Sequence, residues 1–180
     1  MPLFSDIFSD GGLTQYIQKN IHDPWEDTPF QGYVHMSPKQ KGEFGERFVS
    51  QMLKINGHTV KKATTGTSGF DRFVDGAKCE IKFSLATRDG KGGINKDKFV
   101  MNHVSKDKDW DYLLFVGINK EEEDVRILWF TREDFKVNVS TYFNIQQGGN
   151  KIGNDDHMCT DIPGLMKCEW VNTGIEGLKQ

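Results

Sequence analysis

Two carboxylates and one lysine are spaced so that a single hairpin could bring them together. Asp71 comes shortly before an Asp75-Gly76 pair, and Glu80 and Lys82 follow that pair. Asp-Gly between two apolar runs is typical of a two-residue β-turn. With that turn, Asp71 stands directly across from Glu80, with Cβ atoms about 5 Å apart. Lys82 lies two residues beyond Glu80 and points to the same face of the strand.

Two acids in that position repel each other unless a cation lies between them. Magnesium prefers hard oxygen ligands and keeps several waters, so Asp71, Glu80 and the backbone carbonyl of Ile81 could hold it. The metal would polarise a phosphate and activate a bound water, and Lys82 would orient that water or stabilise the charge that develops. These residues predict magnesium-dependent phosphodiester hydrolysis. A cross-strand salt bridge on a sheet surface is the simpler interpretation, but it accounts poorly for two acids with one lysine.

A helix is predicted immediately upstream of the hairpin. The segment Ser37–Gln40 combines a capping box with proline at the first helical position, and Gly57 is a typical end signal. Around this helix, Glu46 falls at the edge of the apolar face and could look toward a sheet, whereas Glu43 looks outward. We expect Glu46 to bind a second metal ion or to orient a water ligand. The alternative is an ordinary solvated residue.

Periodicity and turn signals predict the remaining elements. They are a helix at Leu13–Ile21 in an aromatic arm, an edge strand at Val60–Ala63, a loop at Arg88–Asn95, a helix at Asp97–Val104, a buried strand at Tyr112–Ile118, a strand at Val125–Phe130, a short helix capped by Thr131, and a last strand at Lys167–Val171. The order favours an α/β fold with a central mixed sheet flanked by helices. We expect one domain, with an N-terminal arm at 1–36, a core at 37–135 and a C-terminal extension at 136–180 that serves DNA recognition or dimerisation.

Composition limits the class of protein. The chain of 180 residues has a net charge of −3, so contact with a polyanion would come from local patches or a bound metal. Three cysteines fit a reducing cytosol, and neither a signal peptide nor an apolar run of membrane-spanning length is present, so we expect a cytoplasmic protein. His157, Cys159 and Cys168 are too few and too irregularly spaced to predict zinc.

One basic-rich stretch follows the hairpin. Its members are Arg88, Lys91, Lys96, Lys98, Lys106 and Lys108. They could contact phosphates beside the cleavage centre, or they could form a solvated loop, because four aspartates are interspersed among them. Polar residues at 141–169 could contact base edges. The candidate DNA-binding residues are Arg88, Lys91, Lys96, Lys98, His103, Gln147, Asn150 and Lys151.

The spacing from Asp71 to Glu80-Ile81-Lys82 resembles the motif of the PD-(D/E)xK nuclease superfamily, with Phe70 where that motif often has proline. The segment Lys41–Leu53 resembles the helix that precedes the motif in many members. The resemblance covers Ser37–Ser84 and, more weakly, the strands up to Phe130. It implies a restriction-endonuclease-like α/β/α core, Mg²⁺ as cofactor with Mn²⁺ as a substitute, and double-stranded DNA as substrate.

Small size and added segments at both ends favour a Type II restriction endonuclease. One site per subunit would require two subunits to cut both strands, which predicts a homodimer and a palindromic target. Two alternatives stay open. The first is a structure-specific repair or recombination nuclease, such as a junction resolvase or a nicking enzyme. The second is a catalytically inactive DNA-binding module, against which the intact set of two acids and a lysine argues.

Overall fold

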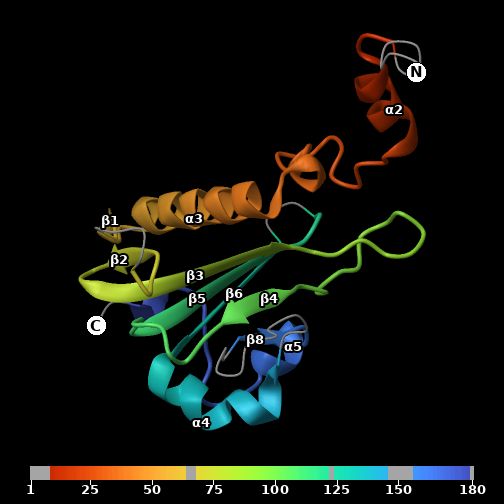
Figure 1. Ribbon diagram of the computed structural model, residues 1–180. Helices are drawn as coiled ribbons and strands as arrows, with labels where there is room; N and C mark the ends of the chain where they lie inside the picture. The colour runs from red at the N-terminus through yellow and green to blue at the C-terminus, as the bar shows by residue number, and fades with distance from the viewer. Residues whose placement is uncertain (1–8, 64–67, 122–123, 146–155, 179–180) are drawn as a thin grey trace, which may run out of the picture.

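A central mixed sheet, flanked by helices, organises the chain (Figure 1). The computed structural model describes residues 9–63, 68–121, 124–145 and 156–178. The six strands run in the order β1-β2-β3-β5-β6-β9. Only β3 and β5 are parallel; the other neighbours are antiparallel. Their bounds are Val60–Lys62 (β1), Arg72–Val74 (β2), Ala77–Leu85 (β3), Tyr112–Ile118 (β5), Val125–Thr131 (β6) and Asn172–Thr173 (β9). The predicted α/β fold is confirmed.

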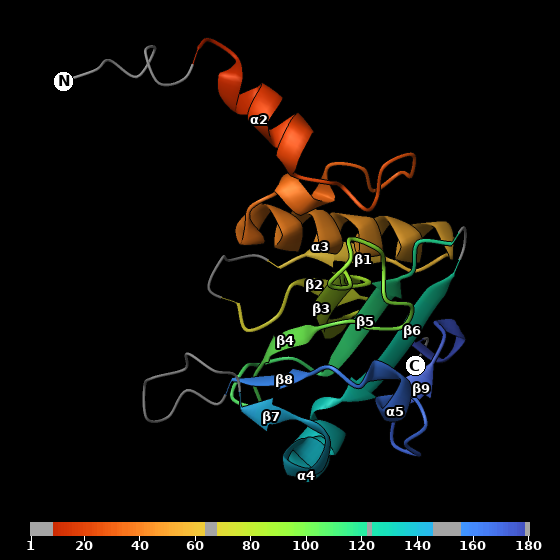
Figure 2. The same ribbon diagram turned by 90° about the vertical axis from the view of Figure 1, so that its right-hand side faces the viewer.

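Helices and a smaller sheet cover the two faces of the central sheet. Helix α3 (Pro38–Ile55) lies on one face. The opposite face carries α4 (Arg132–Tyr142), the short α5 (Ile162–Leu165) and a three-stranded sheet in the order β4-β8-β7 (Figure 2). The strands of this second sheet are Met101–Val104 (β4), Asn144–Ile145 (β7) and His157–Cys159 (β8). Every residue of β5 is buried between these layers. No helix within the described ranges is long and apolar enough to cross a membrane.

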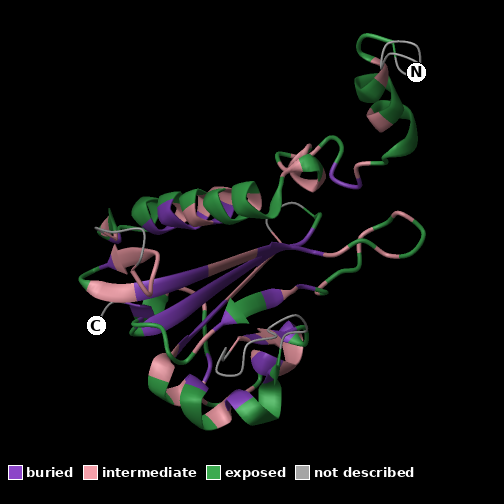
Figure 3. Ribbon diagram, viewed as in Figure 1, coloured by how far each residue is buried: buried purple, intermediate pink, exposed green. Residues whose placement is uncertain are grey.

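The predicted signals for α3 are present in detail. The Ser37 hydroxyl accepts from the Gln40 amide at 3.3 Å, and the Gln40 side chain accepts from the Ser37 amide at 2.9 Å. Beyond the helix, Gly57 has φ +85°, as a left-handed end residue requires. The face toward the sheet is buried and the outer face is exposed (Figure 3). Glu46 is half-buried at the margin of these two faces, and Glu43 is exposed.

The predicted hairpin also forms, with Val74 opposite Ala77 and Arg72 opposite Cys79. Asp75 (φ +50°) and Gly76 (φ +96°) both have the positive φ that a tight type I′ turn needs. The Asp75 carboxylate contacts His58 Nδ1 at 2.6 Å and accepts from the Thr59 amide at 2.8 Å. The turn is thereby tied to the segment that follows α3.

Two predicted elements are wrong. Residues 97–104 do not form a helix, because Asp97 has φ +60° and the chain then forms β4 against β8. Phe99 and Met101 are both buried, an alternation of period two that belongs to an extended chain. The last strand is not at Lys167–Val171, where the chain turns, but at Asn172–Thr173, where it pairs with β6.

The N-terminal arm packs against α3 of its own domain. Trp25 is 2% exposed and contacts the Phe30 ring edge-on, and Phe30 in turn packs against Phe44 and Phe48 of the helix. Helix α2 (Gly12–Asn20), which precedes this segment, has no buried residue and projects away from the body (Figure 2). At the other end of the chain, β8 and β9 complete the two sheets.

Two glycines of α3 differ sharply in their surroundings. A Cβ on Gly45 would lie 2.5 Å from Cβ of Phe83 on β3, whereas a Cβ on Gly42 would meet nothing within 4 Å. Gly45 therefore allows the helix to lie directly on β3. This close contact determines how far Glu46, the next residue, lies from the sheet.

We predict that Gly45→Ala lowers the free energy of unfolding by about 1–3 kcal/mol, because the added methyl forces helix and strand apart. Gly42→Ala is the matched control and should raise it by about 0.5–1 kcal/mol, since alanine is the better helix former. Urea unfolding of both variants measures the difference. Equal effects of the two substitutions would contradict the close helix–strand contact.

Candidate active site

The site forms beside the first residue of β2, Arg72, where β3 continues past the β2–β3 ladder. The ladder between them stops at Arg72 and Cys79, one residue short of Asp71. The Asp71 amide donates to the Cys79 carbonyl at 3.0 Å, and Asp71 Oδ2 accepts from the Ile81 amide at 2.8 Å. The Asp71 carboxylate thus takes the place of the missing backbone partner, and Asp71 is held across from Glu80.

Alternation along the strands puts the acids and the lysine on one face. Arg72 contacts α3 through Ser50 and Glu46, so Arg72 and its partner Cys79 face that helix. Asp71, Glu80 and Lys82 each lie an odd number of residues from this pair and face the other way. The shared face that the hairpin register predicts is therefore present.

Glu80 is the most buried of the three, at 4% exposed. Its Oε1 contacts the ammonium of Lys82 at 2.9 Å and that of Lys108 at 3.3 Å. Burial, followed by the nearby Glu80 charge, raises the pKa of Asp71 from 3.8 to about 6, although the hydrogen bond from Ile81 works against this. The charge of Glu46 adds to the rise of this pKa, and the ammonium of Lys82 lowers it, as the smallest contribution. A cation between Asp71 and Glu80 would relieve their repulsion.

Glu46 occupies a different position from these two acids. Its carboxylate pairs with Arg72 at 3.0 Å, and its backbone carbonyl accepts from the Ser50 hydroxyl at 2.6 Å. Within the described residues, no three His, Cys, Asp or Glu side chains gather closely enough to hold a metal ion. Glu46 is close enough for its charge to add to the raised pKa of Asp71, but its carboxylate is paired with Arg72, and its role as a metal ligand stays a prediction.

The oxygens at this edge fit a hard divalent cation. Asp71 Oδ2 and Glu80 Oε1 have the partners described above, and no described residue donates a hydrogen bond to Asp71 Oδ1 or Glu80 Oε2. In a strand the N–H and C=O of one residue point to the same side. The Ile81 carbonyl therefore faces the edge where Asp71 receives its amide. Two carboxylates and a carbonyl suit magnesium, which completes its shell with water.

A cleft of about 490 Å³ surrounds these oxygens. Its walls come from the N-terminal end of α3, from β3, from the start of β4 and from Lys108. Lys41 lies on the helix wall, with its ammonium 5.3 Å from the centre of the Tyr33 ring. The cleft therefore combines three acids, Glu46, Asp71 and Glu80, with three lysines, Lys41, Lys82 and Lys108.

Among the candidate DNA-binding residues that the structure describes, one lines this cleft. His103 does so, exposed, with Nδ1 2.7 Å from Asp156 Oδ2. Lys96 is paired with Glu121 and Asp124 at 2.7 and 2.9 Å, away from the cleft. Arg88, Lys91 and Lys98 are exposed on the segment between β3 and β4. Gln147, Asn150 and Lys151 lie outside the described residues.

Sequence reasoning missed two cations of the site. Lys108 was one member of a basic-rich stretch, with nothing to mark it as the partner of Glu80 some 28 positions earlier. Lys41 stands five residues before Glu46 in the same helix, about 140° away around its axis, so their spacing gave no signal that both line one cleft.

Comparison with known proteins adds little. No known family matches the chain, and no curated protein matches it either. Among solved structures it is similar to a bacterial homing endonuclease, I-Ssp6803I, with 16% sequence identity and a TM-score of 0.41 over 66% of this chain and 86% of that one. This similarity is loose, and the function proposed below is based on the geometry of the cleft.

The raised pKa of Asp71 predicts a pH-dependent stability of the metal-free protein. The folded chain binds this proton more tightly than the unfolded chain, so stability is highest below pH 4 and falls as the pH rises to about 6. Asp71→Asn removes the charge and should be more stable than wild type at pH 7.5, by on the order of 2 kcal/mol, and nearly equal to it at pH 4. Urea unfolding in EDTA measures this. Asp107→Asn, at an exposed position, is the control. Lower stability of Asp71→Asn at both pH values would contradict the repulsion.

Proposed function

We propose that this protein is a magnesium-dependent endonuclease of the PD-(D/E)xK type that hydrolyses phosphodiester bonds in double-stranded DNA. The observation that carries the proposal is that half-buried Asp71 faces buried Glu80 at the open edge of β3, with lysine ammonium groups beside them in one cleft. A divalent cation requires carboxylate oxygens that converge from neighbouring strands, and two facing acids at a strand edge supply them.

Each side chain has a defined part in the proposed reaction. Asp71, Glu80 and the Ile81 carbonyl would hold Mg²⁺, which when bound polarises the scissile phosphate and lowers the pKa of a water ligand. Lys82 is fixed beside Glu80 and would stabilise the negative charge that develops on the phosphate oxygens or orient the attacking water. Lys108, more exposed than Lys82, would contact a non-bridging oxygen. Lys41, on the opposite wall, would contact a neighbouring phosphate.

The biological role that we propose is that of a Type II restriction endonuclease acting as a homodimer. The single cleft with facing acids supports this, because one active site per subunit would require two subunits for a double-strand cut.

Incubation of the purified protein with several plasmids and Mg²⁺ should yield discrete fragments. Asp71→Ala and Lys82→Ala should each lower the cleavage rate by about 10²–10³-fold or more, because each removes a group that acts on the transition-state charge. Lys54→Ala, an exposed lysine of α3 outside the cleft, should cleave as wild type does. Cutting of branched but not linear duplex would favour the structure-specific nuclease. Absence of cleavage, or cleavage that survives both variants, would refute the proposal.

Removal of the Lys108 ammonium is predicted to change Mg²⁺ affinity and cleavage rate in opposite directions. Removing one of the two ammonium groups on Glu80 frees that carboxylate for the cation, while the phosphate loses a contact. Lys108→Ala should therefore bind Mg²⁺ more tightly and cleave about tenfold more slowly at saturating Mg²⁺, which corresponds to about 1.4 kcal/mol. Cleavage rates over a Mg²⁺ titration separate the two effects. A variant with weaker Mg²⁺ affinity and an unchanged maximal rate would show that Lys108 has a different role.

A further inference from the structure

The segment between β3 and β4 forms a projecting unit held by its own hydrogen bonds. We call residues 87–98 the finger; it leaves the end of β3, runs outward and returns to β4 (Figure 1). Its base is closed by bonds from the Thr87 amide to the Lys98 carbonyl at 2.8 Å and from the Asn95 amide to the Thr87 carbonyl at 2.9 Å. At its tip, Asp89 Oδ1 accepts from the amides of Lys91 and Gly93 at 2.8 and 2.7 Å.

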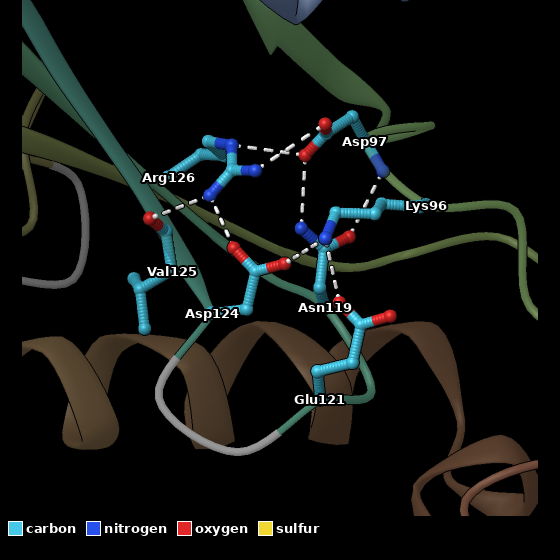
Figure 4. Close-up of polar contacts among 7 residues, drawn as sticks. All are labelled: Lys96, Asp97, Asn119, Glu121, Asp124, Val125 and Arg126. Carbon is cyan, nitrogen blue, oxygen red and sulfur yellow. Dashed lines mark hydrogen bonds and ion pairs between the residues drawn. The ribbon is translucent and has the colours of Figure 1, made fainter.

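A network of charged and amide groups fixes the base of the finger to the β5–β6 connection (Figure 4). Asp97 accepts from Arg126 Nε at 2.9 Å and from its Nη2 at 3.3 Å. Asn119, which is 2% exposed, exchanges two hydrogen bonds with Asp97, at 2.8 and 2.9 Å. Lys96 adds ion pairs to Glu121 and Asp124. Charge-assisted bonds of this kind are stronger than neutral ones, so the finger is held at a set angle to the sheet.

The charge that the finger presents to solvent is positive. Its two acids are engaged, Asp89 by backbone amides and Asp97 by Arg126 and Asn119. Lys96 is neutralised within the network. Arg88, Lys91 and Lys98 are exposed and have no ion pair to a described residue. A chain of net charge −3 thus places three exposed cations on this projection against the one remaining charge of Asp89, which is an arrangement that attracts a polyanion.

The finger also begins and ends at the active-site cleft. Ser84 and Leu85, just before it, line the cleft, and so do Val100 and Asn102, just after it. A duplex with one phosphate at Asp71 and Glu80 would therefore continue along the finger. The arm also reaches the finger just after α2, where Arg88 Nη1 donates to the His22 carbonyl at 3.5 Å.

We propose that the finger is a preorganised DNA-contacting element, which binds the sugar-phosphate backbone of the duplex beside the cleaved phosphodiester bond. The Asp97–Asn119–Arg126 network sets its position. This inference rests on the proposed function, because it assigns contacts to the same DNA that occupies the cleft.

The test measures binding of a labelled mixed-sequence duplex in Ca²⁺ over a range of salt concentrations. The double variant Arg88→Ala/Lys91→Ala should bind at least tenfold more weakly at low salt, and its slope of log K against log salt should be shallower by about 1.8, as expected for two lost phosphate contacts. Lys54→Ala/Lys167→Ala, which removes two exposed lysines that lie outside the cleft, is the charge-matched control. It should bind as wild type does.

The results distinguish failure of the finger's role in DNA binding from failure of the proposed nuclease activity. Equal weakening by both double variants, or wild-type binding by Arg88→Ala/Lys91→Ala in a protein that still cleaves DNA, would overturn the role of the finger and leave the nuclease intact. Absence of both binding and cleavage by the wild-type chain would instead remove the proposed function.

Hydrogen exchange in the absence of DNA tests whether the Asp97–Asn119–Arg126 network holds the finger in place. Arg126→Gln should accelerate hydrogen exchange at the amides of Thr87, Asn95 and Lys98, which close the base of the finger, and should weaken DNA binding. Lys96→Ala removes a half-exposed part of the same network and is the milder variant if Arg126→Gln does not fold. Unchanged exchange in a folded variant would overturn the anchoring role.

Discussion

The early end of the β2–β3 ladder is the constraint on which the site depends. Because β2 begins at Arg72, β3 runs on with an open edge, and the Asp71 carboxylate takes over the Ile81 amide that a longer β2 would have bound. That bond holds an acid across from buried Glu80, and burial, followed by repulsion from Glu80, raises the pKa of Asp71. The chain tolerates this repulsion because the layers around it are fixed independently, α3 by the close contact of Gly45 with Phe83 and the turn by Asp75 with His58.

Cations reach this edge from three separate parts of the chain. Lys82 comes from β3 itself, Lys41 from the start of α3 and Lys108 from the segment that leads into β5. The finger adds an outer set on the same side, and its base is tied to the ends of β5 and β6. The acids lie at the centre, where they could bind a cation, and the lysines and Arg88 lie around them, where they could bind phosphates. This arrangement suits a metal ion that contacts a phosphate.

Local signals predicted the hairpin and α3 well, because their causes are local. Asp75-Gly76 alone determines the turn and thereby the register of Asp71 and Glu80, and the capping box at Ser37 determines where the helix begins. The errors arise where a distant partner decides. Residues 101–104 are a strand because β8 pairs with them from more than 50 residues away, and the positive φ of Asp97 is stabilised by Asn119 and Arg126. The contact of Lys108 with Glu80 has the same origin. It depends on how β3 and β5 align, which no short window of sequence contains.

Calorimetric titration of the metal-free protein with Mg²⁺ at pH 7.5, in the absence of DNA, tests the central claim most directly. The account predicts that wild type and Glu46→Gln bind the ion, since Glu46 is paired with Arg72, and that Glu80→Gln does not. No binding by the wild-type protein, or binding that persists in Glu80→Gln, would contradict the assignment of Asp71 and Glu80 as the pair that holds the metal.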